Sequence, residues 1–322
     1  MTRAYIPEEI LTAAHERSAA RAARDWATAD RLRDEIETAG WRVVDAGTDF
    51  RLEPAHAPEL EDAGRIRYGR SEAVPSRLEE PAQGLATVVL VATDDVAGIR
   101  RAMAGLRSSA PAGTSIVVVE DGPGPDDAAG VETVALATGA TDGIELLSTS
   151  ARLGQGAAWN VGIRRATAPV VIVLDGSIEP TGDIVSPLVA ALGDPAVAVA
   201  GPFGLVTDDV RRFREVEAGP AAAIEGYLMA FRRSDAASRG PVDERFQFYR
   251  NLDIWWSLVL RDEGADVAPR RASVVTHLPI IRHQHLGWER TPPAERERLS
   301  KRNFYRVLDR FGARQDLAVP GD

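Results

Sequence analysis

The sequence predicts an α/β protein in which a mixed, mainly parallel sheet is flanked by helices, with a helical hairpin before it and a helix after it. Three observations predict this class. Residues 7–39 have the apolar spacing of two amphipathic helices. From Leu85 onward, short apolar runs alternate with helical patterns, which is the order that produces a parallel sheet. Residues 170–174 are apolar throughout, as expected for a strand that is buried on both faces.

The composition is typical of a globular protein. The 322 residues are 44% apolar and 27% charged, and no apolar run approaches the length of a membrane span. The N-terminus lacks the apolar core of a signal peptide, so we expect the protein in the cytosol. Cysteine is absent from the sequence, which excludes disulfides, thiolate nucleophiles and cysteine-ligated metals. The formal net charge of −10 argues against broad nucleic-acid binding.

The N-terminal residues predict a helical hairpin with a short β tail. The apolar residues of its second helix share one face: Ala29, Leu32 and Ile36. Asp25 can cap the start of this helix, and Gly40 follows its end. We assign residues 1–52 to the hairpin and its tail, and the proline-containing stretch 53–84 to a linker.

Strands and helices alternate after the linker. Strands are expected at 85–92, 115–119, 144–147, 170–174, 196–200 and 224–233. Helices are expected around Ile99, Met103 and Leu106, and at 157–166, 184–192 and 253–260. These elements form one predicted domain, residues 85–290, and a C-terminal helix and tail occupy 291–322.

Polar side chains, most of them acidic, follow several of the predicted strands. Thr93 and Asp95 come after the first strand, Asp121 after the second, and Asp175 directly after 170–174. Because open α/β sheets bind ligands at the carboxyl ends of their parallel strands, we expect these side chains to converge. An ordinary turn is the alternative explanation of Asp121-Gly-Pro.

A succession of motifs runs through the predicted domain. They are Val88-Val-Leu-Val-Ala-Thr-Asp-Asp95, Ile116-Val-Val-Val-Glu-Asp-Gly122, Gly154-Gln-Gly-Ala-Ala-Trp-Asn-Val-Gly162, Val173-Leu-Asp-Gly-Ser-Ile-Glu-Pro180, Glu225-Gly-Tyr-Leu-Met-Ala-Phe-Arg-Arg233, Val242-Asp-Glu-Arg-Phe246, Asp253 and His283-Gln-His285. In this order they resemble the family 2 glycosyltransferases of GT-A fold. The resemblance implies a hexosyltransferase-type enzyme that moves a sugar from a nucleotide-diphosphate donor to an acceptor hydroxyl, with inversion.

The resemblance also implies which residues hold the donor. The candidates are Thr93, Asp95, Asp121, Arg152, Gly154, Asn160, Asp175 and Ser177. Asp121 matches the carboxylate that reads the base, and Arg152 can pair with phosphate. Gly154 allows backbone to approach the donor. Asn160 and Gly162 match an Asn-x-Gly pattern, in which a structural role for the glycine is an equal alternative.

A divalent cation, Mg²⁺ or Mn²⁺, is implied at the donor diphosphate. Asp175 begins the position of the family's Asp-x-Asp motif, but Ser177 replaces the second carboxylate, which weakens the case for a cation. Glu179 is a substitute only if the local turn brings it to the same side. His283 and His285 are two residues apart, so they share a face on a strand and are the other candidate ligands.

The residues that bind the acceptor are expected after the donor-binding motifs in the sequence. Its candidates are Glu225, Tyr227, Asp243 and Glu244. Where the family carries a Glu-Asp pair with the catalytic base, this sequence has Arg250 and Asn251, so Asp253 is the nearest carboxylate for that role. An acid that stabilises the first turn of a helix is the alternative reading of Asp253.

Several partners and alternatives stay open. The acceptor is a sugar, a lipid-linked molecule or another small molecule, and the basic C-terminal helix allows docking at the inner membrane face. Loss of the motif carboxylates also fits a non-catalytic protein that binds nucleotide sugars or serves in assembly. Residues 21–45 resemble the small helical element at the C-terminus of cysteinyl-tRNA synthetases. Their mixed charges favour packing or homodimerisation over tRNA binding.

Overall fold

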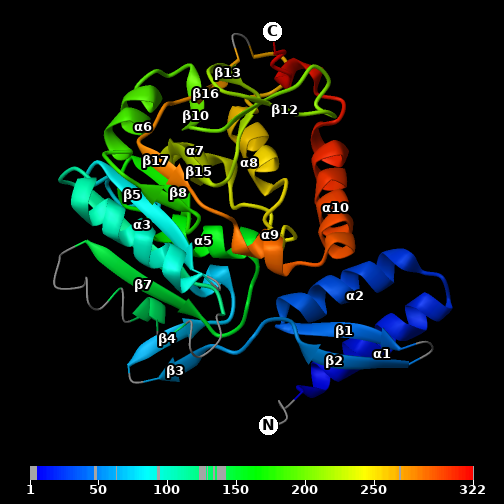
Figure 1. Cartoon of the computed structure of the whole chain (residues 1–322). Coiled ribbons are helices and arrows are strands. Elements are labelled where there is room, and N and C mark those ends of the chain that lie inside the picture. Colours follow the sequence, from blue (N-terminus) through cyan, green and yellow to red (C-terminus); the bar gives the residue numbers. More distant parts are fainter. Residues whose placement is uncertain are drawn as a thin grey trace. The chain divides into compact units, whose positions relative to one another are not determined.

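A computed structural model describes residues 6–46, 49–62, 64–92, 95–122, 128, 130–132, 135, 143–267 and 270–321. The chain forms two compact units, Met1–Arg70 and Ser71–Asp322. Figure 1 shows both units, coloured along the sequence. Residues 53–84, which the sequence predicts as a linker, contribute to both units.

The first unit consists of helices and β-hairpins. Its elements are α1 (Glu8–Ala22), α2 (Trp26–Thr38), β1 (Trp41–Ala46), β2 (Asp49–Pro54), β3 (Leu60–Asp62) and β4 (Arg65–Tyr68). Asp25 Oδ1 accepts a hydrogen bond from the Thr28 N–H at 3.1 Å, which confirms the predicted cap of α2. Ile10 and Ile36 are buried between the helices, and Phe50 of the β1–β2 hairpin packs against them.

The second unit is a mixed sheet covered by helices. Its strands are β5 (Ala86–Ala92), β6 (Thr114–Glu120), β7 (Ile144–Thr149), β8 (Val170–Asp175), β9 (Ile178–Pro180), β10 (Val197–Gly201), β11 (Gly204–Val206), β12 (Arg214–Val216), β13 (Gly219–Ala221), β14 (Ala223–Ile224), β15 (Leu228–Arg232), β16 (Ala272–Val275) and β17 (Ile280–Arg282). Its helices are η1 (Ser71–Ala73), α3 (Val96–Ser109), α5 (Gln155–Arg165), α6 (Val185–Leu192), α7 (Arg233–Arg239), α8 (Leu252–Arg261), α9 (Leu286–Arg290), α10 (Pro293–Phe311) and η2 (Gln315–Leu317).

The main sheet of this unit has the order β13-β16-β10-β15-β8-β5-β6-β7. Strands β8, β5, β6 and β7 run parallel, and β16 is parallel to β10. Strand β15 is antiparallel to both β8 and β10. The predicted mixed, mainly parallel sheet flanked by helices is therefore confirmed.

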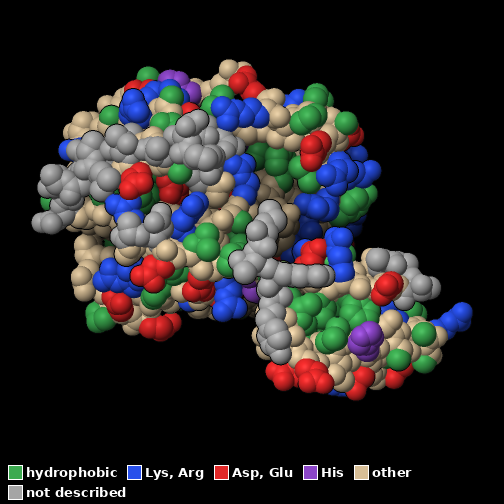
Figure 2. Space-filling model, turned by 90° about the horizontal axis from the view of Figure 1, so that it is seen from below, with side chains coloured by type: hydrophobic (Ala, Val, Ile, Leu, Met, Phe, Trp, Pro, Cys, Tyr) green, Lys and Arg blue, Asp and Glu red, His purple; other side chains and the backbone are tan. Residues whose placement is uncertain are grey.

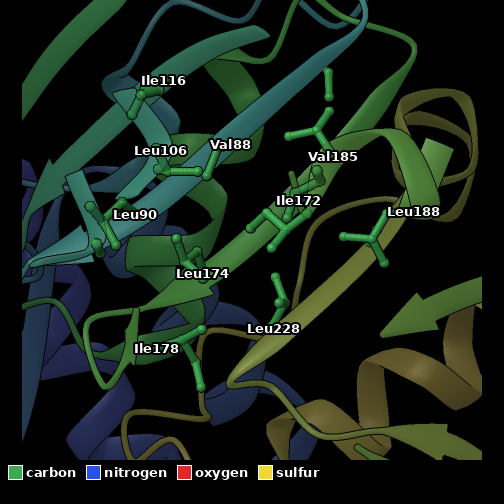
Figure 3. Packing of buried hydrophobic residues seen from close by; sticks show 14 of the residues in the cluster. Val88, Leu90, Leu106, Ile116, Ile172, Leu174, Ile178, Val185, Leu188 and Leu228 are labelled. Atoms are coloured by element: carbon green, nitrogen blue, oxygen red, sulfur yellow. The ribbon is translucent and has the colours of Figure 1, made fainter. Parts of the chain in front are cut away.

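The two faces of the sheet are packed differently. On one face, Leu90 and Ile172 lie in a buried cluster with residues of α3 and α6 (Figure 3). On the other face lies α5. A Cβ atom on Gly162 of α5 would come within 2.1 Å of Val89 Cγ1, so this glycine lets the helix rest directly on β5.

The predicted strand 224–233 is wrong in one respect, because the chain breaks it at residues 225–227. Strand β14 pairs with β11 in a small separate sheet, while β15 pairs with β8 in the main sheet. At the break, the Gly226 N–H donates to Asp253 Oδ2 at 3.0 Å instead of to a neighbouring strand. The alternation of polar and apolar residues here predicted one strand because it does not reveal a change of pairing partner.

The described residues contain no helix with the length and hydropathy needed to cross a bilayer. Helix α10 is amphipathic and buries Val307 and Phe311. Its buried Asn303 donates through Nδ2 to the carbonyl oxygens of Phe248 and Arg250, at 2.8 and 2.9 Å. The helix thereby fixes the backbone that leads into α8.

Candidate active site

Two cavities lie at the end of β8. The first has a volume of about 340 Å³ and is lined by Val91, Asp95, Ile99, Asp121, Arg152, Gly154, Gln155, Asp175, Gly176, Ser177, Gln247, Phe248, Tyr249, His285, Leu286, Gly287, Arg290 and Thr291. The second, of about 410 Å³, is lined by Gln155, Trp159, Asp175, Leu205, Phe213, Glu215, Glu225, Gly226, Tyr227, Tyr249, Arg250, Asn251, Asp253, Ile254, Arg282, His285 and Phe304. Gln155, Asp175, Tyr249 and His285 line both cavities, and we call these four residues the common wall.

Asp175 is the last residue of β8, and the two strands that pair with β8 hold it in place. Its Oδ1 accepts hydrogen bonds from the Ser177 N–H at 2.8 Å and the Ser177 hydroxyl at 2.5 Å. Its Oδ2 lies 3.5 Å from His285 Nε2. Burial alone would raise the pKa of Asp175, but the hydrogen bond and charge of His285 and the hydrogen bonds from Ser177 lower it overall. The carboxylate is therefore ionised at neutral pH.

His285 is fixed by the start of α9. Its Nδ1 accepts a hydrogen bond from the Trp288 N–H at 3.0 Å, so a neutral imidazole carries its proton on Nε2, towards Asp175. The ring also packs on two tyrosines, with centroids 4.3 Å from Tyr249 and 5.7 Å from Tyr227. This arrangement joins α9, the end of β8 and the loop before α8 at one point.

The two histidines predicted as metal ligands have different neighbours. His285 lies beside Asp175, whereas His283 Nε2 lies 2.6 Å from Glu179 Oε2. Strand β17 pairs with β9 and places His283 beside Glu179. Among the residues that the structure describes, no three His, Asp or Glu side chains form a group that would hold a metal ion. Asp175 and His285 fit a cation only if phosphate oxygens complete its ligands.

Asp121 lines the first cavity and also organises the loop before α5. Its Oδ1 accepts from the Leu153 N–H at 2.7 Å, and its Oδ2 from the Gly154 N–H at 3.0 Å. Burial raises the pKa of Asp121, although these two hydrogen bonds oppose the shift. Gly154 has a φ of +98°, and a Cβ atom there would lie 2.7 Å from Gln247 Cα. Both facts require glycine at this position.

The first turn of α5 points its N–H groups at protein atoms. The Gln155 N–H donates to the Gln247 carbonyl oxygen at 3.1 Å, and the Gly156 N–H to that of Phe246 at 2.9 Å. These two N–H groups are therefore satisfied by the protein itself and do not face the cavity as free donors. Arg152, from the loop before α5, does line the first cavity.

Asp95 lines the first cavity as the cap of α3. Its Oδ1 accepts a hydrogen bond from the Gly98 N–H at 2.7 Å. Thr93, the other candidate at the end of β5, lies outside the described residues.

Glu225 and Asp253 are neighbouring carboxyl groups of the second cavity. Asp253 Oδ2 accepts from the Gly226 N–H at 3.0 Å, and its Oδ1 from the Ile254 N–H at 2.9 Å. Glu225 Oε2 is 3.4 Å from Arg282 Nη1, and the Glu225 side chain is 18% exposed. Burial and the charge of Asp253 raise the pKa of Glu225 to about 7, although Arg282 opposes the shift. Burial also raises the pKa of Asp253.

Tyr227 completes this side of the second cavity. The guanidinium carbon of Arg282 lies 4.0 Å from the centroid of the Tyr227 ring. Arg282 therefore lies between an aromatic face and the Glu225 carboxylate, which holds its position.

Asn160, Asp243 and Glu244 line neither cavity. Both amide atoms of Asn160 bond to Val242, at 2.9 Å and 2.8 Å, and its Nδ2 also donates to Glu244 Oε1 at 2.8 Å. Asp243 forms an ion pair with Arg245 at 2.6 Å. In the structure these residues tie α5 to the segment before α8, which differs from the expected contacts with donor and acceptor.

Sequence reasoning missed residues 247–249, which line the first cavity. This segment lacks the periodic pattern that marks a strand or a long helix. The aromatic pair Phe248-Tyr249 just before α8 was the available signal, because large rings next to a candidate catalytic residue often line a ligand site.

The family model described as glycosyl transferase family 2 matches residues 87–254. This range contains β5, β8, the break between β14 and β15, and Asp253. It therefore includes most of the elements around both cavities.

Two solved structures have a similar fold. One is GalNAc-T7 with UDP, GalNAc and Mn²⁺, with a TM-score of 0.58 and 16% identity over 73% of this chain and 50% of that chain. The other is the mannosyltransferase PcManGT from Pyrobaculum calidifontis in complex with GDP-Man and Mn²⁺, with a TM-score of 0.51 and 15% identity over 76% of this chain and 71% of that chain. At these identities the likeness shows the fold alone, which is the GT-A fold.

A short sequence match concerns a different protein. The cysteine–tRNA ligase of Opitutus terrae is 47% identical over 53 residues, which are 16% of this chain and 12% of the ligase. The chain thus spans about an eighth of that relative. The match agrees with the resemblance of the N-terminal hairpin and does not extend to the rest of the ligase.

Proposed function

This chain belongs to the family 2 glycosyltransferases, and we propose that it transfers a hexosyl group from a nucleotide-diphosphate sugar in the first cavity to an acceptor hydroxyl in the second. The common wall is the observation that carries this proposal. Asp175, Tyr249 and His285 line both cavities, so molecules bound in the two cavities would meet there. Contact between a donor carbon and an acceptor oxygen is what direct displacement requires.

The donor is proposed to bind along the ends of the parallel strands. Asp121 is suited to accept a hydrogen bond from the base, and Arg152 to pair with the diphosphate. Asp95 and Gly154 line the same cavity. Ser177 orients Asp175, whose ionised carboxylate would lie near the diphosphate.

In the transfer step, the acceptor oxygen forms a bond to the anomeric carbon while the bond from that carbon to the diphosphate oxygen breaks. The nucleoside diphosphate leaves with the electron pair, and a carboxylate of the second cavity takes the hydroxyl proton. Attack from the face opposite the leaving group would invert the anomeric centre. Asp253 is the base proposed from the sequence, and Glu225 is the second candidate because its pKa is close to neutral.

A divalent cation, Mg²⁺ or Mn²⁺, would supply positive charge to the leaving diphosphate. Asp175 and His285 are the residues proposed to hold it, together with phosphate oxygens of the donor. For Nε2 of His285 to bind the cation, its proton would move to Nδ1, and the hydrogen bond from the Trp288 N–H to Nδ1 would break. On this proposal the cation binds with the nucleotide and only weakly without it.

The test is incubation with UDP-, GDP- and dTDP-sugars, with and without Mn²⁺, scored by release of the nucleoside diphosphate. We expect release with at least one donor, and its loss in Asp175→Asn with the fold unchanged by circular dichroism. Binding of a nucleotide sugar without release under any condition would favour the non-catalytic alternative, a nucleotide-sugar binding or assembly protein.

The remaining proposals concern partners and location. We propose a sugar, lipid-linked or small-molecule acceptor, a place in the cytosol or at the inner membrane face, and self-association through the first unit. A gel shift with tRNA tests the rival role of that unit, and we expect no shift because its charges are mixed.

A further inference from the structure

A third cavity adjoins the second cavity. It has a volume of about 520 Å³, and Arg250, Asn251 and Phe304 line both. Its other lining residues include Trp288, Arg296 and Lys301. A molecule in the second cavity can therefore extend into the third past Arg250.

The charged side chains of the third cavity are mainly cationic. Arg250, Arg296 and Lys301 line it, against the single acid Glu297. The guanidinium carbons of Arg250 and Arg296 lie 4.9 and 4.1 Å from the centroid of the Trp288 ring. Figure 2 shows Lys and Arg side chains gathered on the side of the second unit where α10 lies.

These cations lack carboxylate partners in the part of the chain that the structure describes. No Asp or Glu oxygen there lies within 4.0 Å of a side-chain nitrogen of Arg250, Arg296 or Lys301. Two guanidinium groups near one indole add to the positive potential of the cavity, and a bound oxyanion would offset that charge. Trp288 is 39% exposed, which leaves room beside its indole ring for an apolar part of the same ligand.

The backbone beneath this cavity is held firmly. Asn251 Nδ2 donates to the Ser300 carbonyl oxygen at 2.9 Å, and Asn303 Nδ2 to that of Arg250 at 2.9 Å. Asn303 is fully buried. These bonds join the start of α8 to α10, so Arg250 and Arg296 stand on elements that are tied together.

We propose that the third cavity binds an oxyanion, a phosphate or carboxylate group, that the acceptor carries at a distance from the hydroxyl that receives the sugar. This inference rests on the proposed function, because it takes the second cavity as the acceptor site. The hydroxyl lies by the common wall, the body of the acceptor passes Arg250, and the anion lies between Arg250, Arg296 and Lys301. Arg296 is then a specificity-determining residue.

The first experiment measures binding without turnover. Inorganic phosphate is added at constant ionic strength, and the Arg Nε–H signals are followed by NMR, with chloride as the reference anion. In the wild type we expect saturable shifts of the Arg250 and Arg296 signals. Arg296→Gln should weaken phosphate binding at least about fivefold. Arg298→Gln is the matched control, because Arg298 lies on the same helix, is 64% exposed and lines none of these cavities.

The second experiment compares several acceptors, each used together with the donor from which nucleotide release has been found. Methyl glucoside, glucose 6-phosphate, glucuronate and vesicles containing phosphatidylglycerol distinguish a neutral sugar, a soluble phosphate, a carboxylate and a lipid headgroup. We expect the anionic acceptors to have the higher kcat/KM, and Arg296→Gln to lower it about tenfold for them alone.

Equal phosphate binding by Arg296→Gln and Arg298→Gln would overturn the inference, as would equal use of neutral and anionic acceptors. Release of nucleoside diphosphate from the donor with no added acceptor, where water takes the sugar, tests the glycosyltransferase proposal independently of the anion site. Failure of that release with normal phosphate binding would overturn the proposed function and leave the anion site standing.

Discussion

Glu225 occupies a position in which a carboxyl group is held near neutrality. Its side chain faces the carboxylate of Asp253 and the guanidinium of Arg282, and more distant charges of Glu215 and Arg250 also act on it. A pKa of about 7 places this group at half ionisation under neutral conditions. That value suits a general base, because the group is ionised often enough and still basic enough to take a proton.

With Glu225, the second candidate, as the base, the rate of sugar transfer should rise with pH through about 7, since its carboxylate must be ionised to accept the proton. Glu225→Gln should lower kcat about a hundredfold or more and remove the rise. Initial rates measured from pH 5 to 9 check this. Asp253→Asn is the comparison: it should shift the midpoint to lower pH, because the charge of Asp253 helps to raise the pKa of Glu225. Loss of all turnover in Asp253→Asn, with Glu225→Gln active, would identify Asp253 as the base.

Glu225 should also make stability depend on pH. Its folded pKa of about 7 exceeds its ordinary value of 4.5, so between these values the folded protein binds more protons than the unfolded chain. Stability therefore falls as pH rises through this window. Glu225→Gln should raise the free energy of unfolding by roughly 1–3 kcal/mol at pH 8 and change it little at pH 4.5. Calorimetric melts at both pH values test this, and an equal effect at the two values would contradict it.

At the scale of single elements, the packing of α5 against the sheet depends on the absence of a side chain at Gly162. Gly162→Ala should destabilise the second unit by about 1–3 kcal/mol, because the new methyl group would meet Val89 Cγ1. Urea denaturation measures the change. Val89→Ala in the same chain should recover part of the loss, since it removes the atom that clashes. Additive losses in the double variant would show that the two residues do not touch.

The elements that the sequence predicts well are those with an internal pattern. Strands β5, β6 and β8 lie within a few residues of their predicted bounds, and helix α3 buries the predicted apolar face, because apolar runs and periodic apolar faces are local properties. The break at 225–227 was missed because it depends on which strands lie alongside. The expected common strand face of His283 and His285 is wrong, because β17 ends at Arg282 and His285 already caps α9. The two side chains therefore lie beside different acids, Glu179 and Asp175.

The candidate site was predictable in part. Strand ends located Asp95, Asp121 and Asp175 at the first cavity, and that follows from topology alone. Asn160 and Glu244 were placed by motif order, which does not distinguish a ligand contact from a buried hydrogen bond between segments. The raised pKa of Glu225 was not predictable, because its main cause is burial by residues that are far away in the sequence.

At the scale of the whole molecule, a bound donor nucleotide should stabilise the folded chain. UDP, GDP or dTDP with Mn²⁺ is expected to raise Tm, since a ligand that binds only the native state adds about 2.7 kcal/mol at a hundred times its Kd. Differential scanning fluorimetry identifies the nucleotide. Asp175→Asn should reduce the shift obtained with Mn²⁺. The absence of a shift with all three nucleotides at millimolar concentration would count against a nucleotide site.

The common wall has a consequence for the order of events in a catalytic cycle. Because Asp175, Tyr249 and His285 line both cavities, a glycosyl group cannot leave one substrate and wait on the protein without occupying space that the other substrate needs. Both substrates should therefore be present before either product departs. Double-reciprocal plots at several acceptor concentrations should intersect, as in a ternary-complex mechanism, and parallel lines would indicate a ping-pong cycle through a glycosylated enzyme.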